Sequence, residues 1–498
     1  LYLAFGIDRC TDFNNSLCRW VPTNEKVMNA FARQALPMVW DYAEANLTAD
    51  VVGGWQTCVD HVAACLATVP ADATCPGSAV QLDSMAAFPA AEPIVVSTDP
   101  PYYDNIGYSD LSDFFYVWLR RSLRGVFSDL LSTFLTPKAQ ELISSPYRHK
   151  GGQAAAQRHF QAGFAKAFAI ARQVADESWP LTVYYAFKQT EADDGAKNKS
   201  TSGATGWATM LQSLVDAGFI ITATWPIRAS QNWRIISMGT NALASYIVLA
   251  CRRRSDGAPL GTRRELVSAL RRELPGAVRH LQEGNIAPVD LAQAAIGPGM
   301  AVFSRYSKVM EADGSAMSVR TALGLINQAL DEILAEQEGE FDSDTRWAIA
   351  WFEQFGMQAG EFGVAEVLSK AKDTSVSGLV QAGVIESKAG KVRLLRRDEL
   401  PADWDPATDK RPTVWEMTQH LIRRLDEGEA AAAALARKLG GNAEVARDLA
   451  YRLYLVCERK KWAQEALAYN ALVVAWPRIV QLAASPTASA EPQTRLDV

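Results

Sequence analysis

The fold prediction rests on the stretch IVVSTDPPYYDN, residues 94–105. Its first residues are apolar and β-branched, which is typical of a buried strand. Two consecutive prolines then end the strand, because each fixes its own φ and has no N–H to donate to a ladder. Asp99, directly before them, is restricted to an extended conformation. Its carboxylate is therefore expected at the carboxyl end of a strand, the edge where open α/β sheets bind ligands.

The chemistry of this stretch suits a planar exocyclic amine such as that of adenine. The lone pair of such an amine is delocalised into the ring, and acceptors that hold both of its N–H bonds make the nitrogen more nucleophilic. The Asp99 carboxylate and the Pro100 carbonyl are two such acceptors. A ring at Tyr102 or Tyr103 can stack on the base, which contributes about 1–3 kcal/mol per stacked base. A base in a duplex must first be flipped out of the stack.

The sequence Asp-Pro-Pro-Tyr resembles the signature of methyltransferases that modify amino groups in DNA. Two longer stretches, DPPYYDNIGYSDLSDFFYVWLRRSL at 99–123 and FARQALPMVWDYAEAN at 31–46, make the resemblance more specific. Together they resemble the large adenine-specific DNA methylases of prokaryotes, which carry a zinc ribbon and a long helical C-terminal region and often lie in phage-defence gene clusters. The resemblance extends to about Ile479. It implies transfer of a methyl group from S-adenosylmethionine to adenine N6 in DNA, with other defence-system proteins as possible partners.

The resemblance also assigns roles to single residues. It implies a catalytic set of Asp99, Pro100, Pro101 and Tyr102, a cofactor set of Asp83, Ser84 and Asp99, and a base pocket of Tyr103, Asn105 and Tyr108. Asp and Ser are also common turn residues, so a solvated turn is the alternative for 83–84. A loop that caps the following helix is the alternative for 104–108.

Two basic segments are candidate DNA contacts. Arg148 and Lys150 lie in YRHKGG, residues 147–152, after the catalytic strand. Arg228 and Arg234 lie between the last two predicted strands. Phosphate contacts of this kind position DNA without reading its sequence. A solvated loop is the alternative for 147–152, and a contact on the cofactor side is the alternative for Arg228 and Arg234.

Composition excludes several classes of protein. The 498 residues carry a net charge of −6, which is not the charge of a protein that coats nucleic acid, although a local basic cleft would be enough for DNA. The seven cysteines are scattered without a C-x-x-C pair and the five histidines are dispersed, so neither a disulfide framework nor a metal site is expected. No run of about 18 apolar residues and no signal peptide is evident, which predicts a cytoplasmic protein that does not enter membranes.

The order of predicted elements indicates an α/β fold. Expected strands at 78–82, 94–98, 181–187, 219–225 and 243–251 alternate with helices at 110–123, 153–176 and 207–217. Crossover helices imply parallel pairing, whereas the last two strands suggest an antiparallel pair at one sheet edge. This is the second half of a class I S-adenosylmethionine-dependent methyltransferase sheet, which is Rossmann-like.

We expect six segments. They are a helical segment of the methyltransferase region (1–75, with a helix at 25–46), a catalytic half with the DPPY motif (76–254), a helical connector (255–360), a winged-helix-like module (361–411), a helical bundle (412–483) and a disordered tail (484–498). The wing would carry Lys388, Lys391 and Arg393. DNA contact and protein contact are both open for it.

The glycine-rich cofactor loop of a methyltransferase is missing from this sequence. No Asp/Glu-x-x-x-Gly-x-Gly or Phe-x-Gly-x-Gly pattern occurs, and the sequence opens at Leu1 within an expected helix. We therefore expect a fragment whose cofactor loop lies upstream. Two alternatives remain: a non-catalytic DNA- or protein-binding subunit with a vestigial methyltransferase fold, or a methyltransferase for cytosine N4 or an RNA base.

Overall fold

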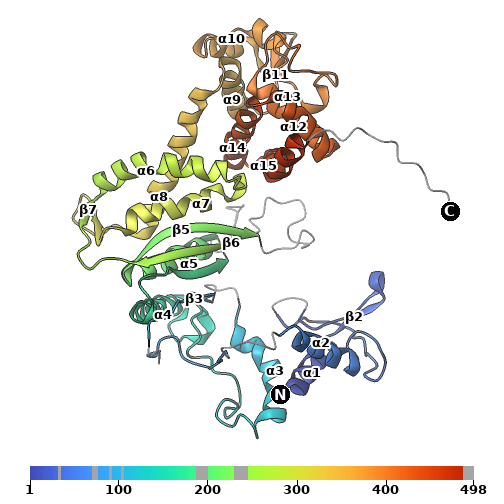
Figure 1. The fold of residues 1–498 in the computed structure, drawn as a ribbon, viewed down its shortest axis with the longest axis vertical. Helices are drawn as coiled ribbons and strands as arrows, with labels where there is room; N and C mark the ends of the chain where they lie inside the picture. Colours follow the sequence, from blue (N-terminus) through green and yellow to red (C-terminus); the bar gives the residue numbers. More distant parts are fainter. Residues whose placement is uncertain are drawn as a thin grey trace, which may run out of the picture. The chain divides into compact units, whose positions relative to one another are not determined.

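The computed structural model describes residues 1–31, 35–69, 77–88, 92–101, 106–186, 200–228 and 245–485 (Figure 1). The fold is mixed α/β with small sheets and a mostly helical C-terminal region. The chain divides into two compact units. The first comprises residues 1–176 and 190–217, and the second comprises 177–189 and 218–498.

The first unit is built mainly from helices. Its elements are α1 (Tyr2–Phe13), β1 (Arg19–Val21), β2 (Lys26–Met28), α2 (Trp55–Ala67), β3 (Ser97–Thr98), α3 (Tyr108–Leu123), α4 (Gly152–Val174) and α5 (Ser200–Asp216), with short 3-10 turns at Pro22–Asn24 and Pro146–Arg148. Helix α1 packs against α2 and α3, and α4 packs against α5. The helices predicted after the DPPY motif and at 153–176 are confirmed with small shifts of their ends.

The helix predicted at 25–46 is wrong. This region holds an antiparallel hairpin of β1 and β2, whose turn includes Glu25 with a left-handed φ of 47°. The Asp12 carboxylate at the end of α1 accepts hydrogen bonds from the Asn29 side chain and from the Phe31 backbone N–H. These long-range contacts, which helix periodicity cannot express, favour the hairpin.

Of the two strands predicted around the site, the first does not form and the second is shorter than expected. No strand forms at 78–82, where Asp83 instead accepts a hydrogen bond from the Met85 N–H at 2.8 Å and so favours a turn. Ile94 makes one parallel bridge, to Ala175 directly after α4. Strand β3 is confined to two residues, which agrees with the strand-ending effect of the prolines.

The first half of the second unit places helices on a small sheet. Its elements are β4 (Leu181–Ala186), β5 (Phe219–Arg228), β6 (Ser245–Arg253), β7 (Leu260–Thr262), α6 (Arg263–Glu283), α7 (Pro288–Ser304), β8 (Lys308–Met310), α8 (Val319–Glu336) and a 3-10 turn at Gln337–Glu340. Strand β6 lies between β4 and β5 and is antiparallel to both. The antiparallel pair of the last two strands is confirmed. Strands β4 and β5 run in the same direction but are not paired with each other.

Helix α7 lies directly against β5 (Figure 1). Pro298 has no N–H, so the Ala294 carbonyl one turn earlier has no helical donor. The Thr224 hydroxyl on β5 donates to this carbonyl at 2.8 Å and accepts from the Gly297 N–H at 3.1 Å. A Cβ at Gly297 would lie 2.5 Å from the Thr224 backbone nitrogen. This position therefore requires glycine for close packing of the helix on the sheet.

We expect Gly297→Ala to destabilise the second unit by about 1–3 kcal/mol, because the added methyl group overpacks the α7–β5 contact. Denaturant unfolding followed by circular dichroism measures this. Gly324→Ala in α8 is the matched control, since a Cβ there meets nothing within 4 Å, and it should stabilise by about 0.5–1 kcal/mol. Equal effects of the two substitutions would contradict this account of Gly297.

The second half of this unit begins with a winged-helix arrangement. Its elements are α9 (Ser343–Phe355), β9 (Gly360–Glu361), α10 (Phe362–Ala371), α11 (Val376–Gln381), β10 (Ile385–Lys388) and β11 (Lys391–Leu394), followed by a 3-10 turn at Arg397–Glu399. The strands form a three-stranded antiparallel sheet in the order β10-β11-β9. This confirms the predicted succession of helices and hairpin, and β9 adds a strand that the sequence analysis missed.

Four helices follow and form a bundle. They are α12 (Val414–Glu427), α13 (Glu429–Leu439), α14 (Asn442–Lys460) and α15 (Ala463–Ala484). By length and composition alone, α15 is apolar enough to cross a membrane, and it is the single such helix within the described ranges. It packs against the other three helices, with Tyr469, Leu472 and Trp476 buried in the bundle.

Candidate functional site

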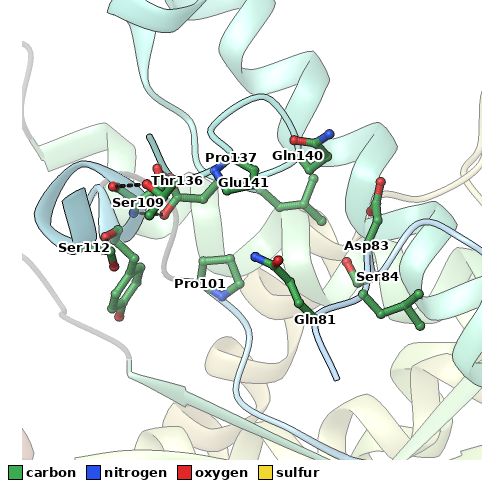
Figure 2. A pocket seen from close by; sticks show the side chains of 13 residues that line it. Gln81, Asp83, Ser84, Pro101, Ser109, Ser112, Thr136, Pro137, Gln140 and Glu141 are labelled. Carbon is green, nitrogen blue, oxygen red and sulfur yellow. Dashed lines mark hydrogen bonds between the residues drawn. The ribbon is translucent and has the colours of Figure 1, made fainter. Parts of the chain in front are cut away.

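A cavity of about 550 Å³ in the first unit is the candidate site (Figure 2). Residues of three segments line it: residues 81–84, Pro101 with Tyr108, Ser109 and Ser112 at the beginning of α3, and Thr136, Pro137 and residues 140–142. The middle segment includes the end of the DPPY region and the first turn of α3. The cavity thus lies where the sequence analysis expected chemistry.

Four residues with predicted roles line this cavity. Asp83 and Ser84, predicted for the cofactor, face it together with Pro101 of the catalytic set and Tyr108 of the base set. Asp99 and Pro100 directly precede Pro101. The other predicted residues of this stretch, Tyr102, Tyr103 and Asn105, lie outside the described residues, as do Arg234 and the side chain of Arg228.

The cavity wall mixes polar and apolar groups. Asp83 uses one carboxylate oxygen to accept from the Met85 N–H, and the Gln81 amide lies beside Pro101 (Figure 2). Leu82 and Leu142 add apolar surface. Most of the lining side chains are polar, and the cavity has the volume of a small-molecule site.

The first turn of α3 is held by a carboxylate from the third segment. Helix α3 begins after Gly107, which has no side chain to cap the helix. The Glu141 carboxylate accepts from the Ser109 backbone N–H at 3.1 Å and from the Ser109 hydroxyl at 2.5 Å. An anionic group at this position also complements the positive end of the helix dipole. Glu141 therefore substitutes for a local cap.

Arg148 completes this network. Its guanidinium forms ion pairs with Glu141 at 2.5 Å and with Asp110 at 2.6 Å, and it donates to the Ser109 hydroxyl at 3.1 Å. Partial burial disfavours the charged form, but hydrogen bonds to Asp110 and Glu141 raise the pKa of Arg148 above its usual value. The Tyr147 hydroxyl donates to the same Asp110 carboxylate at 2.6 Å.

This geometry bears on the predicted DNA contacts. The Arg148 side chain is only 12% exposed and is engaged by carboxylates, which favours an internal role over a phosphate contact. Lys150 is exposed. The sequence analysis missed Glu141 and Ser109, because they lie in segments without a recognisable motif.

A second tether joins the same two segments. Lys138 forms an ion pair with Asp113 of α3 at 2.6 Å, and the Thr136 hydroxyl donates to the Ser109 carbonyl at 2.6 Å. Neither Lys138 nor Asp113 lines the cavity. The loop at 136–148 is thus fixed to α3 by two sets of contacts, and the second set also reaches the cavity through Thr136.

Comparison with known proteins adds one match. Residues 342–496 match a family model described as a domain of unknown function, DUF8807. The match covers the winged-helix arrangement and the bundle but not the cavity. No curated protein and no solved structure matches the chain. Among the described residues, no group of three or more His, Cys, Asp or Glu side chains has the geometry to hold a metal ion.

A cluster of buried titratable groups lies in the matched region. Glu416 and His420 on α12 are each only 3% exposed. Burial and the neighbouring Asp409 raise the pKa of Glu416 from 4.5 to about 9. Burial, with Arg423 and Arg424 nearby, lowers the pKa of His420 to about 4. The Trp404 ring stacks on His420 at 4.3 Å and donates from its indole N–H to Asp409 at 2.9 Å.

The raised pKa of Glu416 makes stability depend on pH. The folded state keeps its proton up to about pH 9, whereas the unfolded state loses it near pH 4.5, so stability falls as pH rises between these values. His420 acts in the opposite sense and only below its ordinary pKa of 6.5. Of these two groups, Glu416 alone contributes to the pH dependence of stability between pH 6.5 and 9.

We expect Glu416→Gln to raise the thermal midpoint in this range and to flatten its decline with pH, because an amide does not titrate. Thermal denaturation at a series of pH values measures both effects. A Glu416→Gln profile as steep as that of the parent chain would refute the assignment.

Proposed function

We propose that this chain carries the catalytic half of an S-adenosylmethionine-dependent methyltransferase that acts on adenine N6 in DNA. The observation that carries the proposal is the meeting of Asp83, Ser84, Pro101 and Tyr108 around one cavity. Each of these four residues is a candidate on sequence grounds alone. Asp83 and Ser84 come from one segment, and Pro101 and Tyr108 come from another. A loop of unrelated function would not be expected to gather the cofactor-side and base-side candidates together.

The donor set of the cavity fits an adenosine group. A carboxylate and a hydroxyl at Asp83 and Ser84 offer partners to ribose hydroxyls or an exocyclic amine, and Leu82 and Pro101 offer apolar surface to a purine face. About 550 Å³ lies within the range of small-molecule sites. The antiparallel β5–β6 pair also supports the proposal, because the methyltransferase resemblance implies such a pair at a sheet edge.

In this mechanism the bound cofactor supplies an electrophilic methyl group, and the chain positions the acceptor. The Asp99 carboxylate and the Pro100 carbonyl accept hydrogen bonds from the two N–H groups of the adenine amine. This reduces delocalisation of the nitrogen lone pair into the ring and makes the nitrogen more nucleophilic. Tyr102 stacks on the flipped base. Tyr108, at the beginning of α3, closes the cavity from the other side. Catalysis then rests on positioning and on these acceptors.

The remaining parts of the proposal follow from the same resemblance. The substrate is DNA with a flipped adenine, the location is cytoplasmic, and the role is restriction or phage defence together with other defence-system proteins. The net charge of −6 requires that DNA be held by a local surface instead of by a generally basic protein. Cytosine N4 or an RNA base remains the alternative acceptor.

We expect Asp83→Ala to weaken S-adenosylmethionine binding about tenfold, since hydrogen bonds to charged groups contribute about 1.5–3 kcal/mol. Asp99→Ala should abolish methyl transfer even at a cofactor concentration that saturates the variant, because the adenine amine loses its carboxylate acceptor. Calorimetry measures binding. Transfer of a tritiated methyl group to DNA, to RNA and to duplexes that contain only G·C pairs identifies the acceptor.

Asp129→Ala, at an exposed position away from the cavity, is the control for both assays. Absence of cofactor binding by the parent chain, with and without an upstream segment that supplies the glycine-rich loop, would refute the methyltransferase proposal. Binding without transfer to any nucleic acid would favour the vestigial alternative.

A second candidate function concerns the winged-helix arrangement. Lys391 on the wing is paired with Glu361, and Arg393 is paired with Glu386 at 2.8 Å and with Glu399 at 2.6 Å. These carboxylates neutralise cations that would otherwise contact phosphates. The pairing favours protein contact over DNA contact for this module, as in the non-catalytic binding alternative.

We therefore expect Lys391→Ala and Arg393→Ala to leave DNA affinity and its salt dependence unchanged. Fluorescence anisotropy with a mixed-sequence duplex over a salt series measures both. Removal of a cation that binds one phosphate would reduce the slope of log K against log salt by about 0.9. A reduction of that size in either variant would assign the wing to DNA.

A further inference from the structure

The strongest unexplained feature of the cavity is the charge network on its α3 side. Glu141 lines the cavity and binds the first turn of α3 at Ser109, and Arg148 joins Glu141 to Asp110 in that same turn. Ser109 itself is 8% exposed and lines the cavity. The network therefore connects two of the three cavity walls through residues that the mechanism above does not use.

We propose that Glu141 and Arg148 are positioning residues, which fix Tyr108 and Ser109 on one wall of the cavity relative to the loop at 136–142 on another. This inference rests on the proposed function and deepens it. Both walls line the cavity, so the contacts of Glu141 with Ser109 and of Arg148 with Asp110 determine how the two walls are placed. Neither residue contacts the reacting atoms in this account, and both act through the placement of α3.

The physical argument begins at the end of α3. The first N–H groups of a helix have no partner within the helix, and Gly107 offers no side chain to satisfy them. Glu141 reaches the Ser109 N–H from a segment 32 residues away and holds the hydroxyl as well. Without this carboxylate the first turn would lose its cap, and Tyr108, the residue at its start, would lose its fixed position.

Arg148 holds the carboxylate in place. Its two terminal nitrogens donate to different carboxylates, one to Glu141 and the other to Asp110. A planar guanidinium can hold both carboxylates at fixed positions, whereas the ammonium of a lysine is a single compact charge. The Glu141 carbonyl also contacts the His159 ring on α4 at 3.2 Å. Glu141 is thus held by Arg148 at its carboxylate and by His159 at its backbone carbonyl, and we infer that this fixes the wall of the cavity.

The network offers a matched control in the same two segments. Lys138 and Asp113 tie the same loop to the same helix at 2.6 Å. Neither lines the cavity or binds the Ser109 N–H, although both contact Thr136, which lines the cavity and donates to the Ser109 carbonyl. Substitution of Lys138 removes an ion pair of similar length without disturbing the cap of α3. A difference between the two substitutions therefore separates placement of the wall from general attachment of the loop.

The test is calorimetric binding of S-adenosylmethionine to the full chain. We expect Glu141→Gln and Arg148→Met each to weaken binding about tenfold, equivalent to about 1.4 kcal/mol. The double variant should bind no more weakly than the worse single variant, since the two residues act as a pair. Arg148→Lys, which keeps the charge but not the fork, should recover part of the loss, and Lys138→Met should stay within about twofold.

Hydrogen exchange of the peptide at 106–116 provides a readout that needs no ligand. Exchange should accelerate in Glu141→Gln and Arg148→Met, and it should match the parent chain in Lys138→Met. Unchanged binding and unchanged exchange in the first two variants would overturn the inference, as would equal losses in Lys138→Met. Failure of the parent chain to bind the cofactor would instead refute the proposed function, and the exchange result would still decide whether the pair fixes α3.

Discussion

Buried backbone groups that their own segment cannot pair are the constraint on which this structure depends. A buried N–H or carbonyl without a partner costs as much as a lost hydrogen bond, so nearly all are satisfied. Here three such groups are satisfied by side chains from distant segments. Glu141 binds the Ser109 N–H at the start of α3, Thr224 binds the Ala294 carbonyl that Pro298 leaves open, and Ser304 accepts from the Ile221 N–H beside the irregularity in β5.

Each of these contacts joins a helix to the surface on which it lies. Thr224 and Ser304 fix α7 against β5 at two points, and the absence of a side chain at Gly297 permits the close approach. Glu141 fixes the loop at 136–148 against α3, and both the loop and the first turn of α3 line the cavity. Packing alone is non-directional, whereas these hydrogen bonds set the register of one element on another.

The sequence predicted what depends on local chemistry. The end of the strand before Asp99, most of the helices after it and the winged-helix hairpin follow from proline, glycine and periodicity within short windows. The segment at 25–46 failed because long-range contacts from Asp12, not local preference, support a hairpin there. Parallel pairing of β4 with β5 was expected, but β6, which comes later in the sequence, lies between them. A short window around either strand does not reveal this order.

The candidate site divides along the same line. Asp83, Ser84, Pro101 and Tyr108 were accessible to sequence analysis because each adjoins a turn or a motif, and all four line the cavity. Glu141 and Arg148 were not, because a glutamate that caps a helix 32 residues earlier has no sequence signature. Arg148 was instead taken for a surface cation. A basic run such as YRHK indicates a solvated or phosphate-binding surface only where no carboxylate pairs with it. Here Asp110 and Glu141 both pair with Arg148.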